Sequence, residues 1–448
     1  MNIVVIGYGT AGMTAASYAK LVNRKVKVTV FEKRGYAVYH PCSIPDVLAR
    51  IIDSWDKLRE PAVKMPGLTV HTGMEVYDID HDNRVVYARN VRGGEEVKVE
   101  YDKLILATGS TPRIPRGLPG IDLNGVFTVK TVEDGERIDK WISNAKNIIV
   151  VGGGAIGIEV ASALVKRGYK VTLFNKSKFL ARGFLDDDMS LRILRLLREN
   201  GVNVIVEDTV AEIKGKEKVE KIVTTKGETL DADAVIFAIG VIAETSLAKK
   251  IGVELTSRGL VKVNERMETS VKDVYAAGDI IEIKDLITGK PTVLQLASVA
   301  FREGRVAGIN AAGGNAIFPG AIRNVIVHTP WFHFGGVGIT SREAKELGFD
   351  VVSITTSAWI KPEFYSDATK ITIKLIADRN SRRILGAQVI GEYGVERELN
   401  IVSVMLKNNM TVEEVLNVDT AYTPTVSDVY DPLYVVAEAV LRRIKRKM

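Results

Sequence analysis

A glycine-rich pattern occurs twice in this chain, each time between a short apolar run and a segment of helical character. The first copy, Gly7-x-Gly9-x-x-Gly12, follows the apolar residues 3–6 and precedes a predicted helix over 14–22. An apolar strand, a tight glycine turn and a helix in this order predict a β-α-β unit. The pattern therefore predicts an α/β fold, because parallel strands need helical connections across the faces of their sheet.

The second copy repeats these features. Residues 147–151 form the apolar run, Gly152-x-Gly154-x-x-Gly157 follows, and a helix is predicted over 158–167. Glycines at these spacings permit the turn and let a pyrophosphate approach the N-terminus of the helix. We therefore expect two Rossmann-like dinucleotide-binding units, which bind two dinucleotides unless one unit has lost its ligand.

The residue that follows the second strand differs between the two units. In the first unit, the strand predicted at 26–31 ends at Glu32, which is followed by Lys33. An acid at this position accepts hydrogen bonds from a pair of ribose hydroxyls, so the first unit is predicted to bind a nucleotide without a 2′-phosphate. The alternative is a β-α-β unit that binds nothing.

In the second unit, no acid follows the strand predicted at 171–174. The next residues are Asn175, Lys176, Ser177 and Lys178. Neutral and cationic side chains here can pair with a 2′-phosphate, which favours NADP over NAD. The alternative is that the two lysines only face water.

Two further apolar strands end in small residues. Residues 104–110 read LILATGS and include Thr108 and Gly109, and residues 235–240 repeat this pattern and end at Gly240. Glycine at the end of a strand permits close approach of another group to the backbone. We expect both strand ends to contact a nucleotide.

A third strand, residues 274–279, reads VYAAGD and ends at Asp279. We expect Asp279 at the start of a helix, where its carboxylate would bond a ribityl hydroxyl of a flavin.

The pattern changes after about residue 325. Strands predicted at 370–376 and 385–390 are followed by a helix near 397–407, without a further phosphate loop. This combination predicts a separate α+β domain, for which dimerisation is the expected role. The predicted limits are 1–112 with 252–325 for the first nucleotide-binding domain, 113–251 for the second, and 326–448 for the dimerisation domain.

The composition also predicts the cellular compartment of the protein. A single cysteine, Cys42, excludes an intramolecular disulfide and is typical of a reducing cytoplasm. No run of eighteen apolar residues is present, and the first residues enter a strand directly, so we expect neither a membrane span nor a signal peptide. We therefore predict a cytoplasmic protein.

The net charge of +6 comes from 61 Lys and Arg against 55 Asp and Glu, which are spread along the chain and do not favour nucleic-acid binding. The one local excess of cations is the C-terminal LRRIKRKM, where a basic amphipathic helix leaves peripheral membrane contact as a minor alternative. Five histidines and no cysteine pair predict no metal site. Only two glutamines suggest a thermophile.

The order of the two glycine motifs, the ATGS and AAGD strand ends and the final α+β domain resembles the pyridine nucleotide-disulfide oxidoreductases over the whole chain. This resemblance implies a glutathione-reductase-like fold with FAD on the first unit, NAD(P)H on the second, and a homodimer. It also makes Val76 and Ala297 candidate cofactor contacts.

Cys42 indicates which subgroup of this family the chain resembles. Its surroundings, YHPCSIP, resemble the single-cysteine subgroup that contains coenzyme A disulfide reductases, NADH oxidases and peroxidases, and NAD(P)H-dependent sulfur reductases. A helix predicted through 46–52 would begin just after Cys42, and its dipole would lower the pKa of the thiol. Asp46, an acid where the subgroup has Tyr, would raise this pKa. The alternative is a buried structural cysteine.

The resemblance also implies further site residues. The segment 421–432, AYTPTVSDVYDP, resembles the coenzyme A disulfide reductase branch, in which a tyrosine of the dimer partner reaches the cysteine; this maps onto Tyr422. Tyr365, in PEFY, is a second candidate, and either phenol could protonate a departing thiolate. Interface packing is the alternative for both. Glu159, inside the helix of the second unit, is expected near the nicotinamide.

The function that this resemblance implies is reduction of coenzyme A disulfide, polysulfide or a related small disulfide, through a mixed disulfide or persulfide on Cys42. An NAD(P)H oxidase or peroxidase that forms a cysteine sulfenic acid is the closest alternative. Sulfide:quinone chemistry would need a cysteine pair, and an NAD(P)H-sensing flavoprotein with an interaction role is an alternative of another class. Coenzyme A would need cations along the first helix, where the sequence offers Lys20, Arg24 and Lys25.

Overall fold

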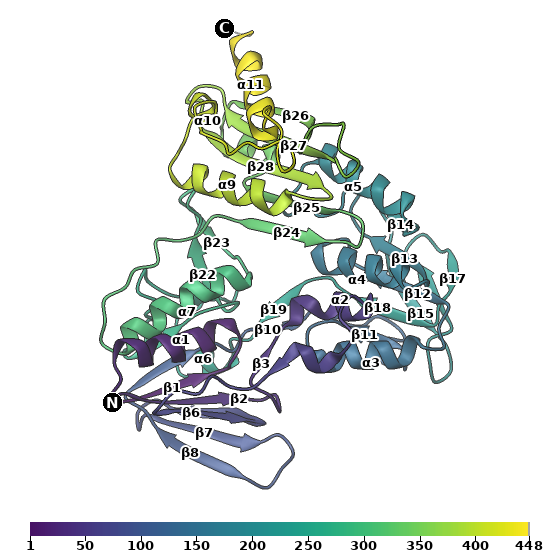
Figure 1. Cartoon of the computed structure of the whole chain (residues 1–448). Helices are drawn as coiled ribbons and strands as arrows, with labels where there is room; N and C mark the ends of the chain where they lie inside the picture. Colours follow the sequence, from purple (N-terminus) through teal and green to yellow (C-terminus); the bar gives the residue numbers. More distant parts are fainter. Residues whose placement is uncertain (447–448) are drawn as a thin grey trace.

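Both glycine motifs lie between a strand and a helix, as their spacing predicts. The computed structural model describes residues 1–446 (Figure 1). β1 (Asn2–Ile6) and α1 (Thr10–Val22) flank the first motif, and β12 (Asn147–Val151) and α4 (Ala155–Lys166) flank the second. Both helices begin earlier than predicted, because the third glycine of each motif lies inside the first helical turn.

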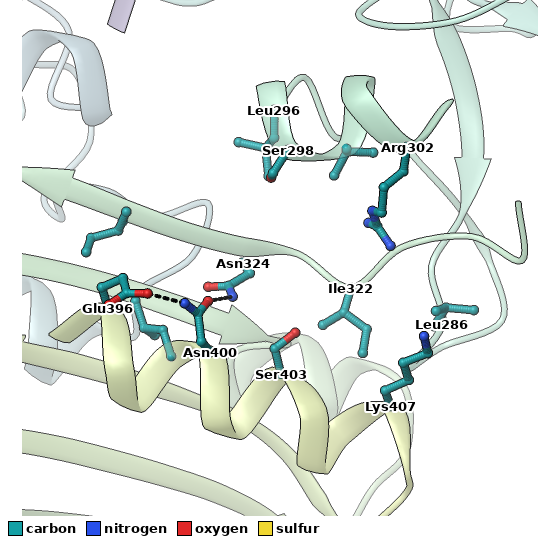
Figure 2. Close-up of a pocket in the computed structure, with 13 residues that line it drawn as sticks. Leu286, Leu296, Ser298, Arg302, Ile322, Asn324, Glu396, Asn400, Ser403 and Lys407 are labelled. Atoms are coloured by element: carbon teal, nitrogen blue, oxygen red, sulfur yellow. Dashed lines mark hydrogen bonds between the residues drawn. The ribbon is translucent and has the colours of Figure 1, made fainter. Parts of the chain in front are cut away.

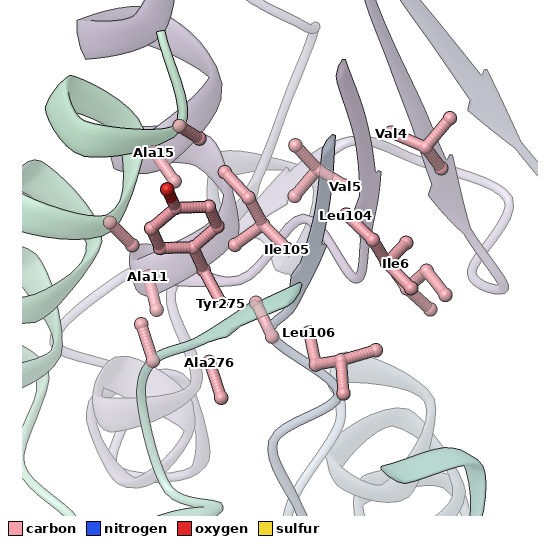
Figure 3. Close-up of a cluster of buried hydrophobic side chains, with 14 of the residues drawn as sticks. Val4, Val5, Ile6, Ala11, Ala15, Leu104, Ile105, Leu106, Tyr275 and Ala276 are labelled. Carbon is pink, nitrogen blue, oxygen red and sulfur yellow. The ribbon is translucent and has the colours of Figure 1, made fainter. Parts of the chain in front are cut away.

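The first unit contains a parallel five-stranded sheet in the order β21-β9-β1-β2-β5. The other strands of this sheet are β2 (Lys27–Glu32), β5 (Leu68–Thr72), β9 (Lys103–Leu106) and β21 (Val274–Ala276). Val5, Ile105 and Tyr275 lie in the core between this sheet and the helices (Figure 3). α1 packs closely on α7 (Ala297–Ala311), since a Cβ on Gly304 would lie 2.2 Å from the carbonyl oxygen of Ala11.

Smaller elements complete the first unit. Its antiparallel sheet comprises β6 (Met74–Asp80), β7 (Val85–Asn90) and β8 (Glu96–Glu100). The later segment adds α6 (Ser246–Lys250), β20 (Val261–Lys262), β22 (Ile281–Lys284) and β23 (Pro291–Thr292). The core of this unit therefore combines residues from both ends of a long interruption in the sequence.

The second unit fills that interruption. Its parallel sheet has the order β11-β18-β12-β13-β14, with β11 (Val126–Thr128), β18 (Ala234–Phe237), β13 (Lys170–Asn175) and β14 (Asn203–Val206). Its helices are α3 (Val132–Ile142), α4 and α5 (Asp187–Glu199), and its antiparallel sheet is β15 (Val210–Lys214), β16 (Lys221–Thr224) and β17 (Thr229–Asp231). The antiparallel pair β10 (Ser110–Pro112) and β19 (Val241–Ala243) carries the chain into and out of this unit.

The segment that follows Cys42 packs on the second unit, although it precedes the predicted start of that unit. A short hairpin of β3 (Val38–Tyr39) and β4 (Arg59–Glu60) brackets this segment. Between them, α2 (Ile44–Leu48) lies beside α4, and its Ile44 and Leu48 are buried in the core of the second unit. The chain crosses from one unit to the other between β3 and α2 (Figure 1), and Cys42 belongs to this connection.

The third unit is a five-stranded antiparallel sheet in the order β24-β25-β28-β27-β26. Its strands are β24 (Asn324–His328), β25 (His333–Gly338), β26 (Val351–Trp359), β27 (Lys370–Asp378) and β28 (Ile384–Gly391), and its helices are α8 (Ser341–Glu346), α9 (Val395–Lys407), α10 (Val412–Val415) and α11 (Pro432–Lys445). The hairpin β24–β25 reaches the second unit, where Val327 and Phe334 join its core. Both strands and the helix predicted here are confirmed.

The basic C-terminal segment is helical, with Arg442, Arg443 and Lys445 in the last turn of α11. Residues 447–448 of the predicted basic terminus lie outside the described residues. Within residues 1–446, every helix is too short or too polar to cross a membrane.

Candidate active site

The first glycine loop is built for close packing against the end of β9. Gly7 has φ +95°, and a Cβ on it would lie 2.2 Å from the carbonyl oxygen of Ala107. A Cβ on Gly12 would lie 1.9 Å from the carbonyl oxygen of Gly7. Only glycine fits these two positions, because any side chain would collide with the backbone.

The second loop repeats this construction on β18. Gly152 has φ +118°, and its Cβ would lie 2.4 Å from the carbonyl oxygen of Ala238, while a Cβ on Gly157 would lie 1.8 Å from that of Gly152. The ATG and AIG strand ends thus hold equivalent places in the two units, as their likeness in sequence predicts.

The middle glycine of each motif faces open space. Gly9 and Gly154 are the N-caps of α1 and α4, neither helix has a side-chain cap, and a Cβ on either glycine would meet no atom within 4 Å. Uncapped backbone N–H groups at a helix N-terminus, with free access to them, suit a pyrophosphate. The chain therefore fits a dinucleotide at both loops.

Glu32 lies at the end of β2 beside the first loop and is buried. Its carboxylate accepts hydrogen bonds from the Tyr8 backbone N–H (2.8 Å), the Arg34 backbone N–H (2.9 Å) and the Arg34 guanidinium (2.6 Å). The acid is thus held in place next to Gly7 and Gly9, and Lys33 beside it is exposed.

Asp279 does not begin a helix, contrary to expectation. It lies in a turn before β22, and the next long helix, α7, begins at Ala297. The reason is that a strand and its return loop fill the space after β21. α7 nevertheless returns to Asp279, because Gln295, just before the helix, donates to the Asp279 carbonyl at 3.1 Å.

The Asp279 carboxylate faces the first strand end. It accepts a hydrogen bond from Ser110 Oγ at 2.5 Å and lies 3.4 Å from Lys130 Nζ. Next to it, Thr108 donates to the Glu244 carbonyl at 2.5 Å, and Gly109 has φ +72° with no atom near its Cβ position. Ser110, Lys130 and Asp279 thus lie together after the end of β9, and Ala297 begins α7 two residues after Gln295. Val76 lies apart in β6, buried in the core of the first unit.

At the second loop, Asn175 has a structural role. Its Oδ1 accepts the Gly153 N–H at 3.1 Å, and its Nδ2 donates to the carbonyl oxygens of Ser177 (2.6 Å) and Phe179 (3.0 Å). The amide therefore joins the glycine loop to the loop after β13 and is already occupied by the backbone.

Lys176 and Lys178 are exposed beside this loop and remain free to meet an anion. Gly240 (φ +102°) lies at the matching end of β18. Lys20, by contrast, is buried, and its ammonium donates to the carbonyls of Arg24 (2.8 Å) and Val26 (2.6 Å). It is therefore not available to a ligand, which corrects the sequence-based expectation.

Cys42 lies in a 3₁₀ turn (Pro41–Ser43) directly before α2. The helix predicted to follow it is shorter than expected and ends at Leu48. The residue reaches solvent, but the protein around its thiol raises the pKa by desolvation. The charge of Glu159 raises this pKa further, the ammonium of Lys130 lowers it, and Asp279 adds a smaller increase.

The expected lowering of the Cys42 pKa is therefore wrong. α2 has barely more than one turn, so its dipole is small, and burial of the thiol dominates. The acid that opposes the thiolate is Glu159 and not Asp46.

Asp46 faces a different group, His328, whose Nε2 lies 3.5 Å from its carboxylate. Glu159 accepts the His328 backbone N–H at 3.4 Å, and burial raises the pKa of Glu159 to about 8 with a further contribution from Asp46. Glu159 is therefore a neutral acid at pH 7, and its charge opposes the Cys42 thiolate only in more alkaline solution.

The two candidate tyrosines lie in the third unit. Tyr422 is 55% exposed, and Tyr365 packs against Phe364 with ring centroids 4.9 Å apart. Within residues 1–446, neither hydroxyl forms a hydrogen bond. Neither tyrosine is among the groups that influence Cys42 in the same chain.

A separate cavity of about 330 Å³ lies between α7 and α9 (Figure 2). Arg302 of α7 and Lys407 of α9 extend toward it, and Asn324 bonds Asn400 across its floor at 3.2 Å. It is lined by the first and third units and contains none of the predicted site residues.

Three residues of this region escaped the sequence analysis: Lys130, which acts on Cys42, His328, which faces Asp46, and His333, which faces His328. They lie in segments without a motif, and the folding of the chain brings them to these partners. No pattern along the chain could have identified them. Within residues 1–446, no group of three or more His, Cys, Asp or Glu side chains could hold a metal ion.

Comparison with known proteins assigns the chain to a family. The model of the pyridine nucleotide-disulphide oxidoreductases matches residues 1–304, and the model of the dimerisation domain of that family matches residues 325–433. These two matches cover most of the chain and divide it before the third unit.

Two curated relatives match over almost their full lengths. The NAD(P)H sulfur oxidoreductase (CoA-dependent) of Pyrococcus furiosus is 35% identical over 98% of this chain and 99% of its own, and the NADH oxidase of Methanocaldococcus jannaschii is 34% identical over 100% of both. The solved structure of a NAD-dependent persulfide reductase from A. fulgidus has a TM-score of 0.95 and 32% identity, covering 100% of this chain and 84% of that one. The resemblance, the fold class and the cofactors FAD and NAD(P)H predicted from the sequence are confirmed. The chain belongs to the pyridine nucleotide-disulphide oxidoreductase family, as an NAD(P)H-dependent flavoprotein oxidoreductase with a C-terminal dimerisation domain.

Proposed function

We propose that this enzyme reduces a small sulfur compound, namely coenzyme A disulfide, coenzyme A persulfide or polysulfide, with electrons from NAD(P)H. The observation that carries this proposal is the place of Cys42, the only sulfhydryl of the chain, at the crossing between the two nucleotide units and within the influence of Lys130, Asp279 and Glu159. The names of the P. furiosus and A. fulgidus relatives support this class of substrate.

The cofactor residues suit this role. Gly7, Gly9, Gly12 and Glu32 would hold FAD on the first unit, with the Asp279 carboxylate near its ribityl chain, and Gly152, Gly154 and Gly157 would hold NAD(P)H on the second. FAD, when bound, accepts a hydride from NAD(P)H and supplies two electrons to sulfur.

Cys42 is the nucleophile that reacts with the sulfur substrate. Its thiolate attacks one sulfur of the substrate, so that one S–S bond forms, one breaks, and the first product leaves as a thiolate or hydrosulfide. Two electrons then cleave the new S–S bond, which releases the second product and restores the Cys42 thiolate. Lys130 stabilises this thiolate, and neutral Glu159 holds a proton for a departing sulfur anion.

The partner subunit's Tyr422 is the second proposed proton donor. Tyr422 belongs to a loop whose apolar side chains Val426, Val429 and Tyr430 are 62–70% exposed. An exposed apolar surface of this kind is typical of a protein–protein interface. The match of residues 325–433 to a dimerisation domain supports subunit pairing through this region. Tyr365, in a neighbouring loop, would support it, because the Asp428 backbone N–H donates to the Ile360 carbonyl between the two loops at 2.9 Å.

Coenzyme A would need cations for its phosphates. With Lys20 buried, Arg24 and Lys25 are the exposed cations at the end of α1 that could meet its phosphates.

The test is an anaerobic NAD(P)H titration of wild type and Cys42→Ser. We expect the wild type, as isolated, to need about one equivalent more than its flavin, because a Cys42 oxidised to a mixed disulfide or persulfide accepts two further electrons. Cys42→Ser should lose this equivalent and the turnover of sulfur substrates, yet keep NAD(P)H–flavin reduction. Unchanged sulfur turnover in Cys42→Ser would refute the proposal.

The M. jannaschii relative is named an NADH oxidase, which makes O2 the second candidate electron acceptor. An oxidase would turn over in air without any sulfur compound, at a rate that matches the rate with its best disulfide substrate. Cys42 would then cycle through a sulfenic acid, which dimedone traps.

A further inference from the structure

A buried carboxyl group lies behind the turn that carries Asp279. Glu303 belongs to α7, and its side chain is buried, with 2% of the residue exposed. Its Oε2 accepts a hydrogen bond from the Gly278 backbone N–H at 2.8 Å. This contact joins the middle of a long helix to the residue directly before Asp279.

The backbone on both sides of Asp279 is held in place. Gly278 has φ +87°, and a Cβ on it would lie 3.1 Å from the Cβ of Ala11 in α1. The Ile281 N–H closes the turn by donating to the Gly278 carbonyl at 3.2 Å. On the far side, Gln295 donates to the Asp279 carbonyl at 3.1 Å. Glu303 therefore provides one of the contacts that fix the position of this turn.

The same part of α7 also packs on the first glycine motif. A Cβ on Gly304, the residue after Glu303, would lie 2.2 Å from the carbonyl oxygen of Ala11. Ala11 lies in the first turn of α1, inside the motif, and it is adjacent to both Gly304 and Gly278. One segment of α7 thus meets the loop that suits a pyrophosphate and the turn that carries Asp279.

Glu303 is neutral at pH 7. Burial raises its pKa to about 8, the Gly278 N–H lowers this pKa, the charge of Asp279 raises it, and Arg302 lowers it by the smallest effect. A neutral carboxyl group accepts the Gly278 hydrogen bond without placing a second negative charge beside Asp279. Above pH 8 the group becomes a carboxylate, which repels the Asp279 carboxylate and disfavours an anionic ligand at this site.

The other titratable groups around Glu303 have partners of their own. The Asp279 carboxylate faces Ser110 and Lys130. The elements that pack on α7 contribute Tyr18 and Lys20 of α1, Lys103 of β9 and Tyr275 of β21, which contact Arg305, the Val26 carbonyl, Asp273 and the Asn310 carbonyl, respectively.

We propose that Glu303 is a positioning residue of the flavin site, which holds the Gly278–Asp279 turn against the ribityl chain of FAD and makes retention of the flavin depend on pH. This inference rests on the proposed place of the ribityl chain at Asp279, and it is independent of the sulfur substrate. Neutral Glu303 keeps the turn in place. Its carboxylate, formed in alkaline solution, weakens flavin binding, so that release of the flavin is coupled to loss of the Glu303 proton.

The experiment measures flavin release from the holoenzyme between pH 6.5 and 9.5, as the increase in flavin fluorescence after dilution. It compares the wild type with Glu303→Gln, Glu303→Ala and the control Glu398→Gln. Glu398 is also a buried acid whose pKa is raised by burial, but it lies in α9 of the third unit. The wild type and Glu398→Gln should release flavin about tenfold faster at pH 9.5 than at pH 7.

Glu303→Gln should flatten this rise, because its amide oxygen still accepts the Gly278 N–H but the side chain cannot ionise. Glu303→Ala should release flavin about tenfold faster than the wild type at every pH, because the Gly278 N–H loses its buried acceptor. A wild-type pH dependence in Glu303→Gln, or wild-type release in Glu303→Ala, would overturn the inference. Glu303→Gln also keeps the test decisive if Glu303→Ala does not fold.

Asp279→Asn separates this inference from the proposal on which it rests. Fast flavin release in Asp279→Asn, together with normal release in the Glu303 variants, would refute the role of Glu303 alone. Normal release in Asp279→Asn would refute the proposed place of the ribityl chain and the role of Glu303 with it. The sulfur mechanism is tested apart from both, since Cys42→Ser should retain its flavin and lose only sulfur turnover.

Discussion

Lys130 Nζ lies 3.4 Å from the Asp279 carboxylate, and both charges act on the thiol of Cys42. The cation and the acid come from positions 149 residues apart and from different units. Among the groups of residues 1–446 that act on Cys42, Lys130 lowers the pKa of the thiol, whereas burial, Glu159 and Asp279 raise it.

Replacement of this cation should make Cys42 less reactive. In Lys130→Met the pKa of Cys42 rises, so a smaller fraction is thiolate at pH 7.5, and each unit of increase slows alkylation about tenfold. Iodoacetamide reports this directly, because the chain has no other cysteine. Lys130→Arg keeps the charge and should retain the wild-type pH profile. Equal profiles for all three proteins would contradict this role.

The two glycine loops should fail in different ways. Gly12→Ala places a Cβ 1.9 Å from Gly7, and Gly157→Ala places one 1.8 Å from Gly152, each at a cost of about 1–3 kcal/mol. Gly12→Ala should lose bound flavin, whereas Gly157→Ala should keep the flavin and lose affinity for NAD(P)H. Absorbance at 450 nm and a nicotinamide titration measure the two losses. Gly183→Ala, with no atom within 4 Å of its Cβ, is the control.

The lysines after β13 should determine the choice of nicotinamide. In Lys176→Gln/Lys178→Gln, kcat/KM for NADPH should fall about tenfold while that for NADH stays constant, because only NADPH carries a 2′-phosphate. Lys166→Gln, at the end of α4, is the matched control. If kcat/KM falls equally for NADPH and NADH, or falls for neither, the variant contradicts recognition of the 2′-phosphate and favours the alternative that the two lysines only face water.

Glu159 should give stability a particular dependence on pH. Its pKa is about 8 in the folded protein and near the ordinary 4.5 after unfolding, so the folded state holds the extra proton between these values. Stability therefore falls as pH rises from 4.5 through 8, by up to roughly a few kcal/mol. Glu159→Gln should flatten this decline in Tm measured from pH 5 to 9, and the surface variant Glu346→Gln should not. A parallel decline in both variants would contradict the raised pKa.

Mixed dimers test whether Tyr422 acts across the interface. One protomer carries Cys42→Ser and the other Tyr422→Phe, with different affinity tags. If the tyrosine comes from the partner, one of the two sites contains both Cys42 and Tyr422, and turnover should reach about half of wild type. If Tyr422 acted within its own chain, both sites would be defective, and activity would stay at or below half that of the Tyr422→Phe homodimer.

Much of the fold follows from local patterns. The glycine spacing places two turns that only glycine can form, and the alternation of strand and helix defines the parallel sheets around them. The errors are local: α1 and α4 begin earlier than predicted because Gly12 and Gly157 are helical, and the turn after Asp279 leads into a strand. Glycine and short loops are compatible with several backbone states, so neighbouring sequence does not decide among them.

The electrostatics of the site could not be predicted in the same way. The amino-acid sequence places a lone cysteine before a helix and a carboxylate four residues after Ala155, but it does not show that α2 packs on α4. That packing brings Glu159 within the influence of Cys42, while the hairpin β24–β25 adds His328 and His333. Other contacts of the folded chain occupy Asn175 and bury Lys20. Motifs are properties of adjacent residues and are visible along the chain. A pKa depends on burial and on charges brought together from distant segments, and only the folded chain specifies these.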